Sequence, residues 1–145
     1  LTRELSVQKT CLEAAEAGLL QSAHDCSDGG LAVALAESCF STLGRSSIGA
    51  QIELESPLSS AVTLFSESPS RIIVTVDTAN VVELGSIAGR NNTPIAVIGS
   101  VTGTALRISL NGDELIALEV AELETAWRTS LSRKLEAEAM VAGKE

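Results

Sequence analysis

The sequence predicts an α/β fold: a single compact domain in which a mixed β-sheet is covered by helices. Segments with apolar residues at helical spacing alternate with short strand-like segments along the chain. Residues 71–76 form a continuous run rich in β-branched side chains, as expected for a central strand. Hydrophobic residues make up 45% of the 145 residues and aromatic residues 2%, so the core must be aliphatic.

The first half of the chain is expected to alternate helices and strands. Residues 4–17 place apolar side chains at helical intervals. An extended piece at 22–26 leads into a helix over 31–37 that is apolar on nearly all sides and therefore buried. Residues 48–54 alternate apolar and polar side chains, as in a strand with one buried face. A serine followed by a proline is typical of a helix start and predicts a helix over 56–65.

The second half continues this alternation. After the central strand, a helix is expected over 78–88 and a strand over 94–99. The Asn111-Gly112 pair is a strong signal for a hairpin turn, which would join strands at 105–110 and 115–118.

The C-terminal part of the sequence is helix-prone. Residues 120–131 are expected to form a helix in which Trp127 anchors the core. The charged residues 133–145 are expected to form a helical tail that follows a domain spanning 1–132.

Composition argues against several classes of function. The net charge is −9 and the ten Lys and Arg residues are scattered, which disfavours binding to a nucleic-acid backbone. No apolar run approaches the roughly 18 residues that a membrane helix needs. Cys11, Cys26 and Cys39 form no CxxC pair and are expected to be buried free thiols. We therefore expect a cytoplasmic protein with neither nucleic acid nor membrane as a partner.

Residues 24–31, His-Asp-Cys-Ser-Asp-Gly-Gly-Leu, carry the most chemical information, at a junction of strand and helix. The two glycines would expose N–H groups at the positive end of the helix, which can receive an anion such as phosphate. Asp25 and Asp28 would repel a bare phosphate and suit ribose hydroxyls, a substrate nitrogen or nucleotide-bound Mg²⁺. Alternatively, Ser27 or Asp28 caps the helix and the glycines permit a tight turn.

A second polar segment, Phe-Ser-Glu-Ser-Pro-Ser-Arg at residues 65–71, precedes the expected central strand. Junctions of this kind border ligand crevices in open α/β sheets. The alternative is a turn closed by a local ion pair between Glu67 and Arg71. His24, the single histidine, is left open between a structural role and that of a general base or ligand contact.

These segments carry a resemblance to a known family. Residues 24–37 resemble the HDxSDGGLAVALAE signature near the C-terminus of phosphoribosylformylglycinamidine synthase, and residues 65–71 are similar to its FSExxxR segment. Residues 94–101 (PIAVIGSV) and 122–131 resemble a later strand and the closing helix of the same family. The resemblance covers residues 5–132 and implies the C-terminal domain of the small synthetase type, with the fold of the aminoimidazole ribonucleotide synthetase C-terminal domain.

The resemblance implies that the chain is part of an ATP-dependent C–N ligase of purine biosynthesis. That enzyme phosphorylates the amide oxygen of formylglycinamide ribonucleotide, and glutamine-derived ammonia then displaces phosphate to form the amidine. The parent enzyme would use ATP and Mg²⁺, bound by an N-terminal portion of the same chain. The other implied partners are a glutaminase subunit and a small bridging subunit.

The resemblance also implies which residues contact substrate or nucleotide, and it implies no catalytic or metal-binding residue. The ligand-contact candidates are Asp25, Ser27, Asp28, Gly29, Gly30, Glu67 and Ser68. Because the family chain contains two copies of its domain pair, they line either the catalytic site or an auxiliary nucleotide site. The isolated domain is expected to be inactive. Two alternatives stay open: another ATP-dependent enzyme of the same superfamily, and a noncatalytic structural or nucleotide-binding module.

Overall fold

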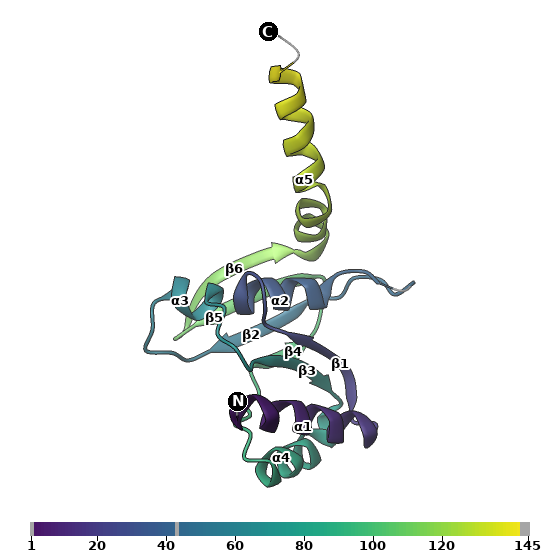
Figure 1. Ribbon diagram of the computed structural model, residues 1–145, viewed down its shortest axis with the longest axis vertical. Helices are drawn as coiled ribbons and strands as arrows, with labels where there is room; N and C mark the ends of the chain where they lie inside the picture. Colours follow the sequence, from purple (N-terminus) through teal and green to yellow (C-terminus); the bar gives the residue numbers. More distant parts are fainter. Residues whose placement is uncertain (1, 43, 143–145) are drawn as a thin grey trace. The chain divides into compact units, whose positions relative to one another are not determined.

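The computed structural model describes residues 2–42 and 44–142, with side chains as far as residue 135. Helices and strands alternate along most of the chain and three consecutive strands precede the last helix, which confirms the predicted α/β class (Figure 1). The described residues form two compact units, each built from two separate stretches of chain. The first unit combines residues up to 38 with 55–98, and the second combines 39–54 with residues from 99 onward.

The first unit is organised around an antiparallel pair of strands. Its pairing runs from Leu20 opposite Val76 to Asp25 opposite Ile72, with an irregularity near Leu20. Helices α1 and α4 lie beside this pair (Figure 1), and the buried cluster Ala14, Leu19, Leu84 and Ile87 joins them to it. The elements are α1 (Thr2–Glu16), β1 (Leu20–Asp25), α2 (Gly30–Cys39), α3 (Ser60–Phe65), β3 (Ile72–Val76), the 3-10 helix η1 (Thr78–Asn80) and α4 (Val81–Arg90).

Strand β3 is not the central strand that its composition predicts. Among the described residues it pairs with β1 alone, in a two-stranded sheet. All of its residues are half-buried, and Val74 and Val76 pack against the buried cluster. The run of β-branched residues therefore follows from the packing of these side chains against the buried cluster. A central position in a sheet is not needed to explain it.

The second unit contains a mixed sheet with strand order β4-β2-β5-β6. Strands β2 and β5 are parallel, and the other two pairings are antiparallel. Asn111 and Gly112 both have positive φ angles (54° and 90°), which confirms the predicted hairpin turn. The buried face carries Ala50, Ile52, Leu106, Ile108 and Leu110. The elements are β2 (Ala50–Leu54), β4 (Gly99–Val101), β5 (Ala105–Leu110), β6 (Asp113–Glu119) and α5 (Val120–Ala142).

The start of one helix differs from the sequence-based expectation. Helix α3 begins at Ser60, with the hydroxyl of Ser59 accepting from the Val62 N–H as its cap. The hydroxyl of Ser56 instead accepts from the Leu58 N–H and from the Thr63 hydroxyl, so it does not start the helix.

The strand expected over 94–99 also differs from the structure. Only Gly99–Val101 forms a strand, β4, which pairs with β2. A Cβ at Gly99 would clash with the backbone oxygen of Gln51, so this pairing depends on close backbone approach at glycine.

Helix α5 also departs from the expectation. The side chain of Trp127 is 54% exposed and is not a core anchor, although its ring lies against Phe40 with 5.8 Å between centroids. The helix continues unbroken to Ala142. The division into a domain over 1–132 and a tail over 133–145 stays a prediction.

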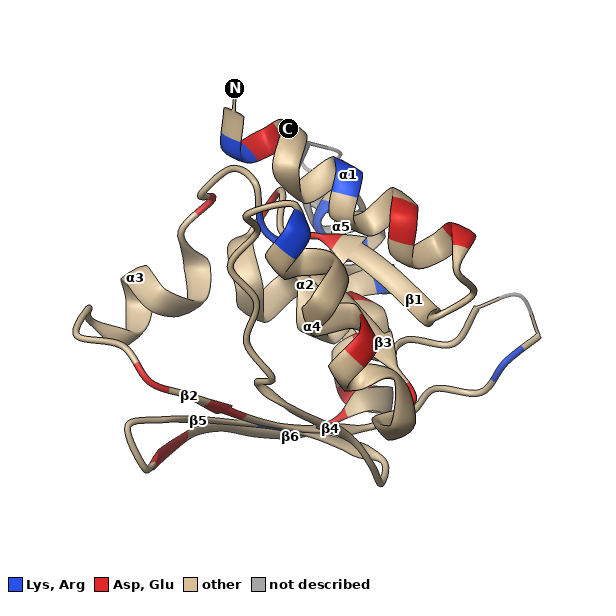
Figure 2. Cartoon of the chain, turned by 90° about the horizontal axis from the view of Figure 1, so that it is seen from below, with Lys and Arg blue, Asp and Glu red and all other residues tan. Residues whose placement is uncertain are grey.

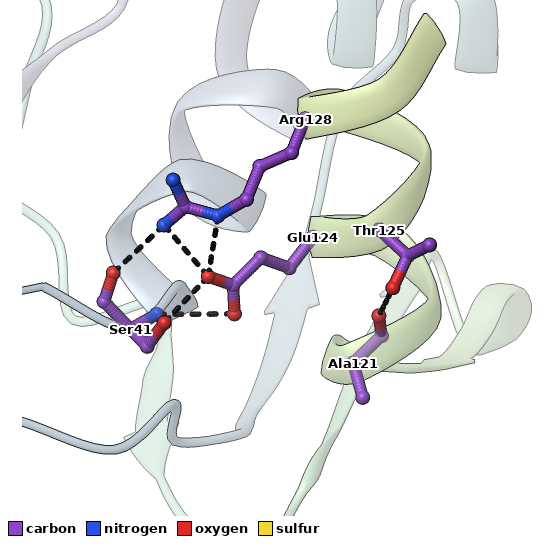
Figure 3. Close-up of polar contacts among 5 residues, drawn as sticks. All are labelled: Ser41, Ala121, Glu124, Thr125 and Arg128. Carbon is purple, nitrogen blue, oxygen red and sulfur yellow. Dashed lines mark hydrogen bonds and ion pairs between the residues drawn. The ribbon is translucent and has the colours of Figure 1, made fainter. Parts of the chain in front are cut away.

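Polar contacts fasten α5 to the segment that follows α2 (Figure 3). The Glu124 carboxylate accepts from both the backbone N–H and the hydroxyl of Ser41. Arg128 pairs with Glu124 at 2.7 Å and donates to the Ser41 carbonyl at 3.1 Å. One turn of α5 thus binds every backbone and side-chain polar group of Ser41.

The charged residues are distributed over several elements. Lys and Arg positions are spread over separate parts of the fold (Figure 2). No helix in the described part of the chain has the combined length and apolar character needed to cross a membrane.

Candidate functional site

The pairing of β1 with β3 brings the two polar segments of the sequence together. Because the strands are antiparallel, the residues that follow β1 lie beside those that precede β3. The Cys26 N–H donates to the Arg71 carbonyl at 2.9 Å, one step beyond the pairing of Asp25 with Ile72. The two segments therefore meet at one end of an antiparallel pair, and not at the carboxyl edge of a parallel sheet.

The closest link between the segments joins a glycine to a carboxylate. The Gly29 N–H donates to Glu67 Oε1 at 3.0 Å. Glu67 thereby supplies a negative group at the N-terminal end of α2, where the helix dipole favours an anion. The carboxylate that reaches this end of the helix comes from 38 residues away, and not from Asp28 as considered from the sequence.

Two physical reasons favour glycine at position 30, next to the contact between Gly29 and Glu67. Its φ angle is +72°, a conformation that side chains disfavour. A Cβ here would also lie 2.8 Å from the backbone carbon of Phe65 and from the backbone oxygen of Ser66. The turn and the segment before β3 are thus in backbone contact at Gly30.

The acidic residues of the turn have different environments. The Ser27 hydroxyl donates to the Asp25 carboxylate. This hydrogen bond, with a smaller contribution from the backbone N–H of Asp25, lowers the pKa of Asp25. Asp28 is exposed and forms no hydrogen bond or ion pair with the described residues. Asp28 is therefore free to contact a ligand, whereas Asp25 already orders the turn.

Ser68 is also weakly held. It is exposed, and its hydroxyl lies 3.5 Å from that of Ser66. All seven predicted residues lie in the first unit, at or near the junction of the two segments. The structure joins Gly29 to Glu67, and it leaves Asp28 and Ser68 facing solvent.

The Glu67–Arg71 ion pair, which the sequence left open as an alternative, does not form among the described residues. Arg71 Nη2 donates instead to the Ser66 carbonyl, and Arg71 Nε is buried without a hydrogen-bond partner among the described residues. The arginine that ends the FSExxxR segment is the one feature of the sequence that pointed to this contact with Ser66.

A second anchor of the segment had no sequence signal. The Ser70 hydroxyl donates to the Glu4 carboxylate of α1, 66 residues away. This bond and a second one from Gln8 lower the pKa of Glu4. Ser70 has φ +63°, so the chain reverses here in a conformation that few non-glycine residues adopt.

His24 joins the end of β1 to α2. Its Nε2 lies 3.3 Å from Glu37 Oε2, and its Nδ1 lies 2.7 Å from the Asp25 carbonyl oxygen. Both ring nitrogens thus have protein partners. This arrangement favours the structural interpretation of His24 over a role as a base.

Burial governs the chemistry of the three thiols. Cys26 and Cys39 are buried, Cys11 is half-buried, and burial raises the pKa of all three thiols. Within the described residues, no three His, Cys, Asp or Glu side chains gather closely enough to hold a metal ion.

Sequence comparison identifies the family. Residues 1–111 match the family described as AIR synthase related protein, C-terminal domain. The phosphoribosylformylglycinamidine synthase subunit PurL of Thermoanaerobacter sp. (strain X514) is 39% identical over 136 residues, which cover 94% of this chain and 18% of that protein. The PurL subunit of Anaeromyxobacter sp. (strain K) is 38% identical over 149 residues, covering 99% and 19%. The chain spans about a fifth of the length of these curated relatives.

Solved structures support the same fold. T. maritima PurL complexed with FGAR aligns with a TM-score of 0.73 at 24% identity, over 83% of this chain and 20% of that one. The PurLQS structure from Thermotoga maritima gives a TM-score of 0.67 at 23% identity, over 81% and 21%. The fold is thus shared, and the family match extends over most of the sequence. This chain belongs to the family of AIR synthase related proteins, as a C-terminal domain.

Proposed function

We propose that this chain is the C-terminal domain of a phosphoribosylformylglycinamidine synthase of the PurL type. The observation that carries the proposal is the hydrogen bond from Gly29 to Glu67, which joins the two motifs that resemble that synthase. The relatives named PurL, at 38–39% identity over nearly the whole chain, support it. The reaction is phosphoryl transfer from ATP to the amide oxygen of formylglycinamide ribonucleotide, followed by attack of ammonia.

In this proposal the domain positions ligand and carries out no chemical step itself. Asp28 and Ser68 face solvent and offer a carboxylate and a hydroxyl to ribose hydroxyls or to a substrate nitrogen. Asp25, Ser27, Gly29, Gly30 and Glu67 hold the backbone on which these groups are displayed. Phosphoryl transfer followed by attack of ammonia depends on orientation and charge neutralisation more than on a protein nucleophile.

The proposal assigns the remaining components to the rest of the assembly. ATP and Mg²⁺ are assigned to the N-terminal portion of the parent chain, as the family resemblance implies. Ammonia comes from a glutaminase subunit, with a small bridging subunit as the third partner. The assembly is placed in the cytoplasm.

The test uses the full-length parent chain with its partner subunits, ATP, Mg²⁺, ammonia and formylglycinamide ribonucleotide. Asp28→Asn should reduce amidine formation by about tenfold or more, because one charged contact to the ligand is lost. Glu122→Gln, which changes an acidic residue of α5 in the second unit, is the matched control and should leave the rate unchanged. Equal rates for the wild type and both variants would show that the turn does not contact the ligand. A well-folded but inactive wild type would refute the synthase assignment.

The isolated chain should be inactive. It spans about a fifth of its curated relatives and has no catalytic residue in this proposal. The purified chain should therefore show no ATP hydrolysis that depends on formylglycinamide ribonucleotide. Hydrolysis of that kind would contradict the proposed division of labour.

One observation favours a second candidate, a structural module without ligand. The Glu67 carboxylate already has a partner in the Gly29 N–H, as expected for a joint between two segments. A purely structural module should show no thermal shift with ATP or with formylglycinamide ribonucleotide in the full-length chain carrying a disabled N-terminal site. A shift that Asp28→Asn abolishes would favour ligand binding at the turn.

A further inference from the structure

The segment that carries Glu67 and Ser68 has no helix or strand of its own. It connects α3 to β3, and Glu67, Ser68 and Pro69 are all exposed. An exposed connection of this kind keeps one conformation only where side chains fix it. Its position therefore depends on a small number of identifiable contacts.

Arg71 provides the first of these contacts and is itself well fixed. Its carbonyl accepts the Cys26 N–H at 2.9 Å, which extends the pairing of β1 with β3. From this fixed backbone, the guanidinium turns back and donates to the Ser66 carbonyl. Arg71 thus closes the segment into a loop by binding its first residue.

The physical character of this bond suits a positioning role. A charged donor bound to a carbonyl is stronger than a neutral pair, and the planar guanidinium restricts its direction. Arg71 Nε is buried with no hydrogen-bond partner in the described part of the chain, so the donation to Ser66 is the polar contact that holds this side chain. The bond fixes the peptide that leads directly into Glu67.

A second anchor acts at the other end of the loop. Ser70 adopts φ +63° and donates to the Glu4 carboxylate on α1. The reversal at Ser70 sets the direction in which the chain leaves Ser68. With Ser66 and Ser70 both held, Glu67 is aimed at the Gly29 N–H, 3.0 Å away.

We infer that Arg71 is a positioning residue of the candidate site, acting through the Ser66 carbonyl to present Glu67 and Ser68 beside the Asp28-Gly29-Gly30 turn. The inference rests on the proposed function, in which Ser68 and Asp28 face the ligand. Arg71 itself touches no ligand. Its effect is on where the loop lies.

The first measurement follows the loop without any ligand. Hydrogen–deuterium exchange of the full-length chain is read at the Gly29 amide, which Glu67 protects. Arg71→Ala should speed this exchange by about tenfold or more, since a charge-assisted bond is lost. Arg71→Lys keeps a charged donor and should restore most of the protection. Arg90→Ala, which removes an exposed arginine of α4 in the same unit, should leave Gly29 unchanged.

The second measurement follows ligand use in the full-length synthase with its partner subunits. Arg71→Ala should raise the KM for formylglycinamide ribonucleotide or for ATP by about tenfold, with kcat within about twofold, because binding geometry is lost and chemistry is not. Arg71→Lys should recover most of the wild-type KM. A general loss of folding would not produce this split or this rescue.

The two measurements separate the inference from the proposed function. Unchanged Gly29 exchange in a folded Arg71→Ala protein overturns the inference. Faster exchange with both KM values unchanged upholds Arg71 as the anchor of the loop and refutes ligand contact at Ser68. If Arg71→Ala does not fold, Ser70→Gly replaces it, because glycine accepts the positive φ and removes only the bond to Glu4. Ser70→Gly should also speed Gly29 exchange, and full protection in that variant would count against an anchored loop.

Discussion

Glu124 accepts hydrogen bonds from both the backbone N–H and the hydroxyl of Ser41, which lies 83 residues earlier in the sequence. Arg128, one turn along α5, donates hydrogen bonds to both the Glu124 carboxylate and the Ser41 carbonyl. The helix is therefore fastened to the chain after α2 through polar groups more than through Trp127, whose side chain is largely exposed. The strength of this attachment depends on the ionisation of one carboxyl group.

The stability of the second unit should depend on pH through Glu124. The hydrogen bond from the Ser41 hydroxyl, followed by the bond from Arg128, lowers the pKa of Glu124 below its usual value of 4.5. A lowered pKa in the folded state gives stability that is fully present above the pKa of the unfolded chain. That stability is lost as the pH falls through the folded pKa.

Thermal melting between pH 7 and pH 3 tests this dependence. The wild type should lose more stability below about pH 4.5 than Glu124→Gln, which has no such group to protonate. Glu122→Gln on the same helix should keep the wild-type profile. Parallel profiles for the wild type and Glu124→Gln would show that the contact adds no pH-dependent stability.

Alanine at Gly30 should be far more harmful than alanine at another glycine of similar backbone conformation. Gly18 and Gly30 have φ angles of +71° and +72°, so both variants share the backbone strain. A Cβ at Gly30 would meet backbone atoms less than 3.0 Å away, whereas a Cβ at Gly18 would meet nothing within 4 Å. We expect Gly18→Ala to cost about 1 kcal/mol and Gly30→Ala about 3 kcal/mol or more in the free energy of unfolding.

Urea unfolding of both variants measures the difference. Similar midpoints for the two would mean that the contact between Gly30 and the Phe65–Ser66 backbone is not close in solution. Faster exchange at the Gly29 amide in Gly30→Ala alone would tie the loss to this junction.

The buried thiols should be protected from modification. Burial raises the pKa of Cys26 and Cys39, so little thiolate is present at neutral pH and reagents reach them poorly. Both should react with a disulfide reagent at least about a hundredfold more slowly in the native chain than in guanidinium. Cys11, which is only half-buried, should react first. Mass mapping of the labelled sites decides the order, and labelling of Cys26 ahead of Cys11 would be inconsistent with the burial described.

Removal of Trp127 should cost less than removal of a buried tryptophan. The side chain is 54% exposed and contacts Phe40, so Trp127→Ala should lower the free energy of unfolding by about 1–2 kcal/mol, against about 3–5 kcal/mol for a buried aromatic side chain. Leu131→Ala, at 69% exposure on the same helix, should fall within about 0.5 kcal/mol of the wild type. Since Trp127 is the sole tryptophan, efficient acrylamide quenching of its fluorescence would provide an independent check.

Local sequence patterns are enough to predict an element when residues adjacent to it in the sequence determine where it begins and ends. The expected limits of β5 are confirmed because alternation and the Asn111-Gly112 turn define both ends. The expected start of α3 is wrong because two serines three residues apart could each cap a helix, and the choice between Ser56 and Ser59 depends on contacts with Thr63.

Long-range pairing explains the other differences. The sequence of β3 predicts that the strand packs among apolar side chains, but it does not predict how many strands pair with it. For the candidate site, spacing and residue type are enough to single out both segments. The bond from Ser70 to Glu4 is not foreseeable, since the partners are 66 residues apart and no local pattern pairs them.

The interleaving of the two units has a consequence for synthesis on the ribosome. Strand β2 is made before residues 55–98, but its neighbours β4 and β5 are made after them. A nascent chain that has emerged only as far as residue 98 can complete the pairing of β1 with β3, yet it carries β2 without either partner strand. Pairing between distant segments is slow to form, so β2 is the strand that must be kept from misassociation while translation continues.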